Sequence, residues 1–148
     1  MKSLLAWLGV SFLPALIGAP FPAPAWYRSL NRPRWSPPAW VFGPVWTFLY
    51  ASMGVAAWLV WRRGGRRRVP LALFGVQLAL NAAWTPLFFG ARAIGPALAE
   101  IVATWVAVLA TTVAFARQRS LAGALLLPYL AWVSFATALT ASIWRRNR

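Results

Sequence analysis

The sequence lacks cysteine and histidine altogether, and Glu100 is its single acidic residue. Without these side chains there is no disulfide framework, thiol nucleophile, zinc site, Ser-His-Asp triad or haem iron held by His or Cys. One carboxylate alone also excludes the acid/base pair of a glycosidase. We therefore expect no metal site, no bound cofactor and no ordinary acid/base enzyme.

Charge is scarce as well, and it is almost all of one sign. Charged residues make up 11% of the 148 residues and hydrophobic residues 61%, whereas about a quarter of a soluble domain is charged. A soluble domain of this size could not bury so much apolar surface, so the composition indicates a membrane protein. The net charge of +14 also fits a nucleic-acid-binding protein. However, the arginines lie almost wholly between long uncharged windows, where they would contact head groups, so we expect no nucleic-acid partner.

Five windows between the charged residues are long enough for membrane-spanning helices. The windows are Ser3–Tyr27, Trp35–Trp61, Val69–Ala91, Ala93–Ala116 and Ser120–Trp144. Only the fourth contains a charge, that of Glu100. The windows predict an all-α membrane protein, with residues 1–148 forming a single domain, a bundle of five transmembrane helices. The approximate spans are 4–19, 38–61, 69–89, 94–115 and 121–144. At this point the first window also fits a secretory signal peptide, because Met1-Lys2 precedes a short apolar run.

The connection over residues 20–39 is rich in proline and longer than a plain connector needs. Its arginines alternate with aromatic residues, which suggests a segment at head-group level. Arg28, Arg32 and Arg34 could form a rim that meets ligand carboxylates through charge-assisted bonds. The basic residues do not set the orientation of the bundle, because 8 lie on the N-terminal side and 7 on the other.

Aromatic and polar residues recur at helical spacing on three spans. The faces are Phe42, Trp46, Tyr50 and Met53; Asn81, Trp84 and Phe88; and Trp132, Ala136 and Leu139. Pro44, Pro86 and Pro128 lie in the same spans, and each removes a backbone donor. The pattern predicts a kinked, aromatic-lined cavity between helices, with Asn81 as a polar anchor. Ordinary packing or lipid-facing surface is the alternative, and Asn81 fits an interhelical hydrogen bond equally well.

Two further features also leave alternatives open. Glu100 lies inside a span, where a carboxyl indicates a functional group by default. The alternatives are a structural group held by hydrogen bonds and an ion-pair partner of Arg92. Gly75, Ala79 and Ala83 form a ridge of small residues that fits a dimer face or internal packing of the bundle.

From the proline-rich connection onward, the sequence resembles the TspO/MBR family, also called the translocator protein or peripheral-type benzodiazepine receptor family. The resemblance rests on Trp26-Tyr27, Leu30-Asn31-Arg32-Pro33, Trp35-Ser36-Pro37-Pro38-Ala39-Trp40-Val41-Phe42-Gly43-Pro44-Val45-Trp46, Gln77-Leu78-Ala79-Leu80-Asn81, Pro128-Tyr129-Leu130-Ala131-Trp132 and Trp144-Arg145-Arg146-Asn147. It implies a bacterial-type member with five membrane helices, which keeps its first helix and often forms homodimers. It also implies a place in the bacterial cell membrane, without distinguishing inner from outer.

The resemblance implies binding of porphyrins or other tetrapyrroles, and of sterol-like or benzodiazepine-type ligands, by a sensor or transporter. The matching ligand-binding positions are Trp26, Trp35, Trp40, Trp46, Tyr50, Asn81, Trp84, Phe88, Phe89, Trp132, Ala136 and Leu139. An alternative is light-dependent oxidative breakdown of protoporphyrin, with Trp46 and Trp132 as the catalytic residues. A third hypothesis is a solute transporter coupled through Glu100. The family's sterol-recognition stretch reads Leu139–Arg145 here and lacks its tyrosine.

Overall fold

The computed structural model describes residues 2–18, 33–35, 41–63, 68–90 and 93–147. Its helices are α1 (Lys2–Ser11), α2 (Leu13–Gly18), α4 (Phe42–Arg63), α5 (Arg68–Thr85), the π-helical turn η2 (Pro86–Gly90), α6 (Ile94–Gln118) and α7 (Ser120–Asn147). Four helical segments are long and apolar enough to cross a membrane: Gly43–Arg62, Arg68–Phe88, Ile94–Gln118 and Ser120–Asn147. A fifth apolar segment, Ser3–Leu16, is shorter. The protein is an all-α membrane protein, as the sequence predicts.

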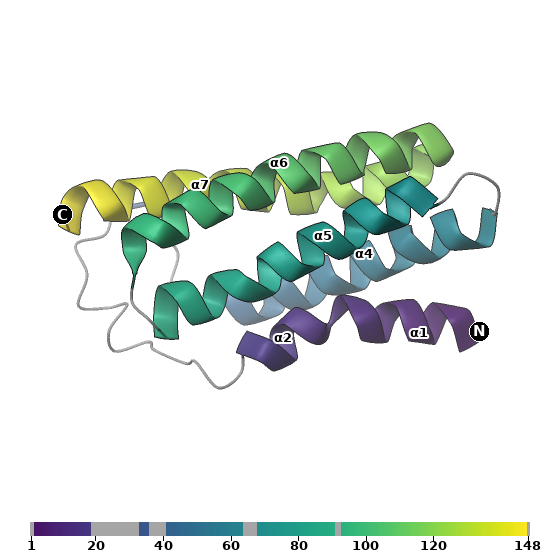
Figure 1. Ribbon diagram of the computed structural model, residues 1–148, viewed down its shortest axis with the longest axis horizontal. Helices are drawn as coiled ribbons and strands as arrows, with labels where there is room; N and C mark the ends of the chain where they lie inside the picture. The colour runs from purple at the N-terminus through teal and green to yellow at the C-terminus, as the bar shows by residue number, and fades with distance from the viewer. Residues whose placement is uncertain (1, 19–32, 36–40, 64–67, 91–92, 148) are drawn as a thin grey trace.

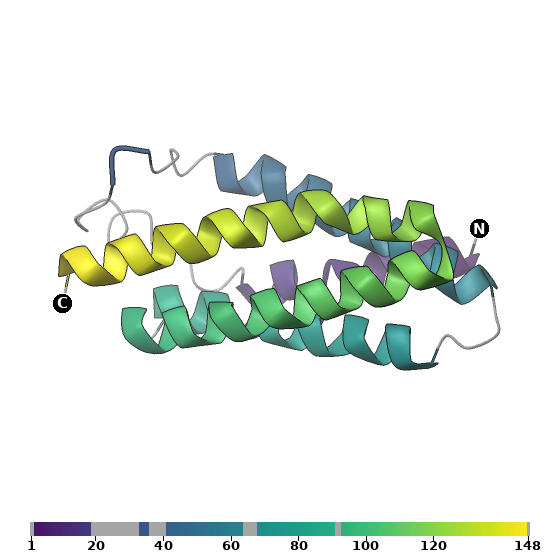
Figure 2. The same ribbon diagram turned by 90° about the horizontal axis from the view of Figure 1, so that it is seen from above.

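The four long helices run side by side along the long axis of the molecule (Figures 1 and 2). α6 packs against α7 and α5, and α4 packs against α7. The N-terminal helices complete the bundle, because α1 lies against α4 and α2 against α5. Consecutive long helices are antiparallel, so the ends of α4 and α6 and the starts of α5 and α7 lie at the same end as the N-terminus (Figure 1).

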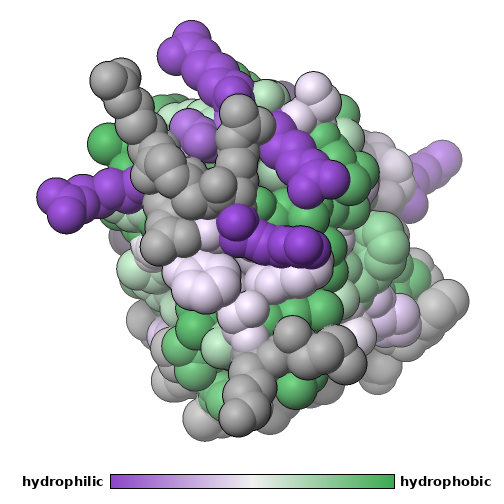
Figure 3. Space-filling view, turned by 90° about the vertical axis from the view of Figure 1, so that its right-hand side faces the viewer, coloured by the Kyte–Doolittle hydropathy of each residue, from purple (hydrophilic) through white to green (hydrophobic). Residues whose placement is uncertain are grey.

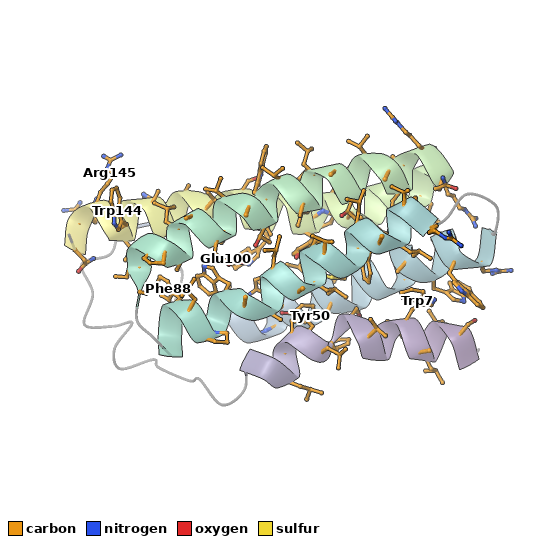
Figure 4. All side chains as sticks on the ribbon, in the orientation of Figure 1. Trp7, Tyr50, Phe88, Glu100, Trp144 and Arg145 are labelled. Carbon is orange, nitrogen blue, oxygen red and sulfur yellow. The ribbon has the colours of Figure 1, made fainter. Side chains whose placement is uncertain are left out.

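The basic residues sort to the two ends of the bundle. Arg62, Arg68, Arg117 and Arg119 are exposed, and they belong to the helix ends that meet beside the N-terminus. Figure 3 looks onto this end and shows hydrophilic side chains projecting outward around it. Arg145 lies at the opposite end, near the C-terminus (Figure 4). The apolar length between the two ends is the part that a bilayer core would surround.

The first apolar segment is not one continuous helix, which differs from the single span predicted over residues 4–19. α1 ends at Ser11, Phe12 forms a turn, and α2 begins at Leu13. Pro14 explains the interruption, because proline has no amide to donate to the carbonyl of Val10. The Phe12 carbonyl begins the new helix by accepting from the Ala15 amide at 3.0 Å.

Pro86 and Pro128 act differently on the backbone, although the sequence predicts a kink for both. α5 ends at Thr85, and the chain widens into the π-helical turn Pro86–Gly90. There the Leu87 carbonyl accepts from the Ala93 amide at 3.1 Å. In contrast, α7 continues as a helix through Pro128. Thus, of these two prolines, Pro86 alone ends its α-helix, and it does so beside Phe88, one of the predicted site residues.

Two glycines allow the closest approaches between helices. A Cβ atom at Gly54 of α4 would lie 2.7 Å from the Ser11 hydroxyl oxygen and 3.1 Å from the Leu8 Cα. A Cβ atom at Gly123 of α7 would lie 2.5 Å from the Cβ and 2.7 Å from the Cα of Ala116 on α6. Since Arg119 is the only residue between α6 and α7, Gly123 allows the two helices to begin packing within one turn of the connection.

We predict that Gly123→Ala destabilises the bundle, because its new methyl group would overlap the backbone of Ala116. Overpacking of this kind typically costs about 1–3 kcal/mol, so the midpoint of thermal unfolding in detergent micelles should fall. Gly9→Ala in α1 is the matched control, since nothing lies within 4 Å of a Cβ placed there and alanine favours a helix over glycine. Equal midpoints for the two variants would contradict this account.

Candidate functional site

A chain of aromatic rings joins four separate parts of the sequence. Trp35, in the described part of the connection before α4, meets Phe135 of α7 at 5.5 Å between ring centroids. Phe135 lies 5.3 Å from Trp132, and Trp132 lies 6.4 Å from Trp46 of α4 in an edge-to-face contact. Trp46 stacks on Tyr50 at 5.3 Å, and Phe12 lies 5.5 Å from Tyr50. All these distances are those of favourable aromatic pairs.

A second aromatic pair lies where α5 meets the π-helical turn. Trp84 and Phe88 stack at 4.7 Å with 14° between their planes. Phe88 is almost fully buried and packs with Ala97 of α6 and with Leu139 and Ile143 of α7. These contacts place three predicted site residues, Trp84, Phe88 and Leu139, in one cluster. The cluster joins α5, α6 and α7.

A buried hydrogen-bond network lies beside the rings and connects α4, α5 and α7. The Tyr129 hydroxyl donates to Gln77 Oε1 at 2.6 Å and accepts from Asn81 Nδ2 at 2.8 Å. The Tyr50 hydroxyl donates to Asn81 Oδ1 at 3.1 Å. All four residues are buried, and Trp46 contacts both tyrosine rings. Asn81 therefore forms interhelical hydrogen bonds, which was one of the two roles that its position left open.

Glu100 is only half satisfied by its surroundings. The Thr104 hydroxyl lies 2.9 Å from Glu100 Oε1 and 3.0 Å from the backbone carbonyl of the same residue. The other carboxyl oxygen, Oε2, is buried and has no hydrogen-bond partner among the residues that the structure describes. Figure 4 shows the side chain on the inner side of α6. Arg92, the partner considered from the sequence, lies outside the described residues.

Several predicted site residues come together in this region. The chain of aromatic rings contains three of them, Trp46, Tyr50 and Trp132. Ala136 is partly buried against the hydrophobic core to which Tyr50 belongs. Trp35 joins the chain through Phe135, although half of its surface is exposed. Because the described side chains here pack against one another, the cavity itself stays a prediction.

The structure does not describe every residue of the predicted site. The residues outside the described ranges are Trp26, Trp40, Arg28 and Arg32, and the side chains of Phe42 and Phe89 are not described either. Arg34 is described and is exposed.

Three residues of this arrangement were absent from the predicted site: Gln77, Tyr129 and Phe135. Gln77 lies one helical turn before Asn81, and a search for paired amides on one helix face would have found it. Tyr129 and Phe135 flank Trp132 at helical spacing in the same way. Tyr129 was overlooked because a single phenol on an apolar span gives no signal until its partners on other helices are known.

The ridge of Gly75, Ala79 and Ala83 faces outward. All three residues are exposed, and the space around a Cβ at Gly75 is open. This finding excludes internal packing of the bundle as the reason for the small residues. The dimer face predicted from them stays a prediction.

The sequence matches the model of the TspO/MBR family over residues 3–145. The chain belongs to the TspO/MBR family. A translocator protein from Homo sapiens is 49% identical over 126 residues, which cover 82% of this chain and 75% of that protein. A tryptophan-rich sensory protein from Cereibacter sphaeroides is 41% identical over 143 residues, covering 97% and 90% of the two chains. A tryptophan-rich protein from Archaeoglobus fulgidus is 39% identical over 149 residues, covering 99% and 95%.

Family membership confirms the resemblance seen in the tryptophan and proline pattern. Together with its apolar helices, it makes this TspO/MBR chain a multi-pass integral membrane protein. The relatives span bacteria, an archaeon and a mammal.

We predict that Tyr129→Phe destabilises this TspO/MBR protein more than Tyr50→Phe does. The first change removes the partner of both Gln77 Oε1 and Asn81 Nδ2, whereas the second removes the partner of Asn81 Oδ1 alone. Each buried polar group left without a partner costs about 1–3 kcal/mol. Thermal unfolding of both variants in the same detergent would measure the difference. A larger loss of stability in Tyr50→Phe would contradict the central place of Tyr129.

Proposed function

We propose that the protein binds porphyrins or other planar tetrapyrroles at the aromatic rings around the buried tyrosine network. The observation that carries the proposal is the arrangement of Trp46, Trp132 and the Trp84–Phe88 pair. Trp46, Trp84 and Trp132 all pack against the hydrophobic core that contains Tyr50 and Tyr129, and Phe88 of η2 stacks on Trp84. Indole and phenyl faces bind flat apolar rings through stacking and surface burial, and a few polar groups give orientation.

Binding by stacking suits this composition, because the chain has no His or Cys to ligate iron. Arg34 is exposed on the segment next to Trp35 and could meet the carboxylates of a bound porphyrin. Arg28 and Arg32, proposed for the same rim, lie outside the described residues. Sterol-like and benzodiazepine-type compounds, which the family resemblance implies, are further apolar ligands for the same rings.

We also propose that binding serves sensing or transport in the bacterial cell membrane. Support comes from the names of two relatives, a translocator protein in Homo sapiens and a tryptophan-rich sensory protein in Cereibacter sphaeroides. The outward ridge of Gly75, Ala79 and Ala83 supports a homodimer in the lipid bilayer, since small residues allow close helix approach.

The binding proposal predicts that Trp46→Leu/Trp132→Leu weakens protoporphyrin binding about tenfold or more, because each lost aromatic contact contributes about 0.5–1.5 kcal/mol. Titration of the purified protein in detergent, followed by porphyrin absorbance, measures the dissociation constant. Trp105→Leu is the matched control, since that indole bonds Ser134 on the exposed side of α6 and α7 at 2.7 Å. Saturable binding of equal affinity in all three proteins would overturn the assigned site.

Light-dependent oxidative breakdown of protoporphyrin is the second candidate function. The contact between the Trp46 and Trp132 rings at 6.4 Å favours it, because two indoles would border one bound ring. Light would excite the porphyrin, and dioxygen would be reduced as the terminal oxidant while the ring is oxidised. The indoles would relay electrons from the ring to dioxygen and return to their starting state.

This second candidate predicts that illuminated wild-type protein gives a distinct porphyrin product that Trp46→Phe/Trp132→Phe does not give. Phenylalanine keeps an aromatic face for binding but is far harder to oxidise than indole. Absorbance spectra and mass spectrometry of the products make the comparison, with free tryptophan and serum albumin as controls. Identical products from the wild type and from these controls would remove the enzymatic role.

A further inference from the structure

The end of the bundle beside the N-terminus carries positive charge that neither the packing of the helices nor the proposed stacking site uses. Arg62 lies in the last turn of α4 and Arg68 begins α5, while Arg117 lies in the last turn of α6 and Arg119 connects α6 to α7. All four side chains are exposed, and Figure 3 shows hydrophilic side chains projecting around this end. We call these four residues the arginine face.

The chain itself does not neutralise the arginine face. Its single acidic side chain is that of Glu100, and none of the residues outside the described ranges is acidic. Glu100 and Arg117 both lie in α6, and at 1.5 Å per residue their positions are about 25 Å apart along the helix axis. That distance is far too long for an ion pair, so the counter-charge of the arginine face comes from outside the chain.

The side chains next to two of these arginines are exposed and apolar. Val69 follows Arg68 and is 67% exposed, and Leu121 lies two residues after Arg119 and is 50% exposed. Both belong to helical segments that are long and apolar enough to cross a membrane. A soluble anion would leave these apolar side chains in water, whereas a phospholipid offers a phosphate to the guanidinium and an acyl chain to its neighbour. The neighbours therefore favour a lipid over a free phosphate.

Arg62 is held in position by an aromatic ring. Its guanidinium carbon lies 4.8 Å from the centroid of the Trp58 ring, which is within the range of a cation–π contact. The Trp58 indole donates to the Ser3 hydroxyl at 3.2 Å, so the ring is tied to α1. Tryptophan side chains are typical of the head-group level of a bilayer. The Trp58 ring therefore holds the guanidinium at the depth where lipid phosphates lie.

We infer that the arginine face is a binding site for the head groups of anionic phospholipids. Guanidinium groups form charge-assisted hydrogen bonds with phosphate oxygens, often two at once. Each basic residue near an anionic membrane surface strengthens the attraction by about fivefold. A lipid with a net negative charge supplies the counter-charge that the chain lacks, whereas a zwitterionic lipid brings its own cation. The arginine face therefore selects phosphatidylglycerol over phosphatidylcholine.

The test places a fluorescent label at Ser120→Cys, because the chain has no cysteine of its own and Ser120 is exposed beside Arg119. The labelled full-length protein is reconstituted in phosphatidylcholine vesicles. A minor fraction of the lipid, either phosphatidylglycerol or phosphatidylcholine in parallel samples, carries a nitroxide spin label near the head group. Quenching of the fluorophore then reports how often each lipid occupies the arginine face. We expect phosphatidylglycerol to associate about fivefold more strongly, and added salt to remove most of this preference.

Arg117→Gln/Arg119→Gln in the same labelled protein should reduce the preference to about twofold or less, because two guanidinium groups near the label are removed. Arg145→Gln/Arg146→Gln is the matched control, since it removes the same charge from the other end of α7, a helix of 28 residues. That end lies about 40 Å from the label along the helix, which is several Debye lengths. The control should keep the full preference.

Three results would contradict the inference: equal quenching by the two lipids when all arginines are kept, an unchanged preference in Arg117→Gln/Arg119→Gln, or an equal loss in Arg145→Gln/Arg146→Gln. If glycerol phosphate in the buffer removes the preference at constant ionic strength, the arginine face binds free phosphate and the assignment to a lipid is wrong. The comparison of the two lipids needs no porphyrin, so its result does not depend on the stacking site.

Discussion

The hydrogen bonds of Tyr129 are the constraint on which the rest of the site depends. Inside a bilayer a polar side chain finds no water, so its partners must come from neighbouring helices. Gln77 and Asn81 of α5 therefore have to meet Tyr129 of α7, and Tyr50 of α4 has to meet Asn81, at a fixed depth. This requirement sets the rotation and the vertical register of three helices at once.

The positions of the aromatic rings follow from that register. Trp46 lies one helical turn from Tyr50, Trp84 lies nearly one turn from Asn81, and Trp132 lies nearly one turn from Tyr129. Each network residue thus orients a tryptophan on its own helix toward the same region. A change that shifts the network would therefore move the three indoles together.

Hydroxyl groups fix two further helix contacts by bonding to backbone carbonyls of neighbouring helices. Ser11 of α1 donates to the carbonyl of Tyr50 at 2.7 Å, and Ser52 of α4 donates to that of Leu125 at 2.7 Å. The hydrophobic effect does not drive helices together inside lipid, so close packing and such bonds take its place. Gly54 makes the first contact feasible, because any side chain there would meet Ser11.

The spacing of charges was enough to predict the long helices, because a bilayer requires uninterrupted apolar segments and excludes arginine from them. The faces carrying Trp46, Asn81 and Trp132 could also be predicted, since they depend only on helical periodicity. The partners of Asn81 could not be predicted, because Tyr50 and Tyr129 reach it from other helices at distances that no single span encodes. Nor does the sequence distinguish Pro86, which begins a π-helical turn, from Pro128, which α7 accommodates. Whether the α-helix ends or continues at a proline depends on the packing around that proline rather than on the proline itself.

The single residue between α6 and α7 makes one packing unit of the last two helices. Arg119 leaves no slack in the connection, and Gly123 already lies against Ala116 within the first turn of α7. The two helices therefore form a tight hairpin, in which α6 contacts α5 and α7 contacts α4. This hairpin ties the two sides of the bundle together, because neither of its helices can shift along the other without straining the connection.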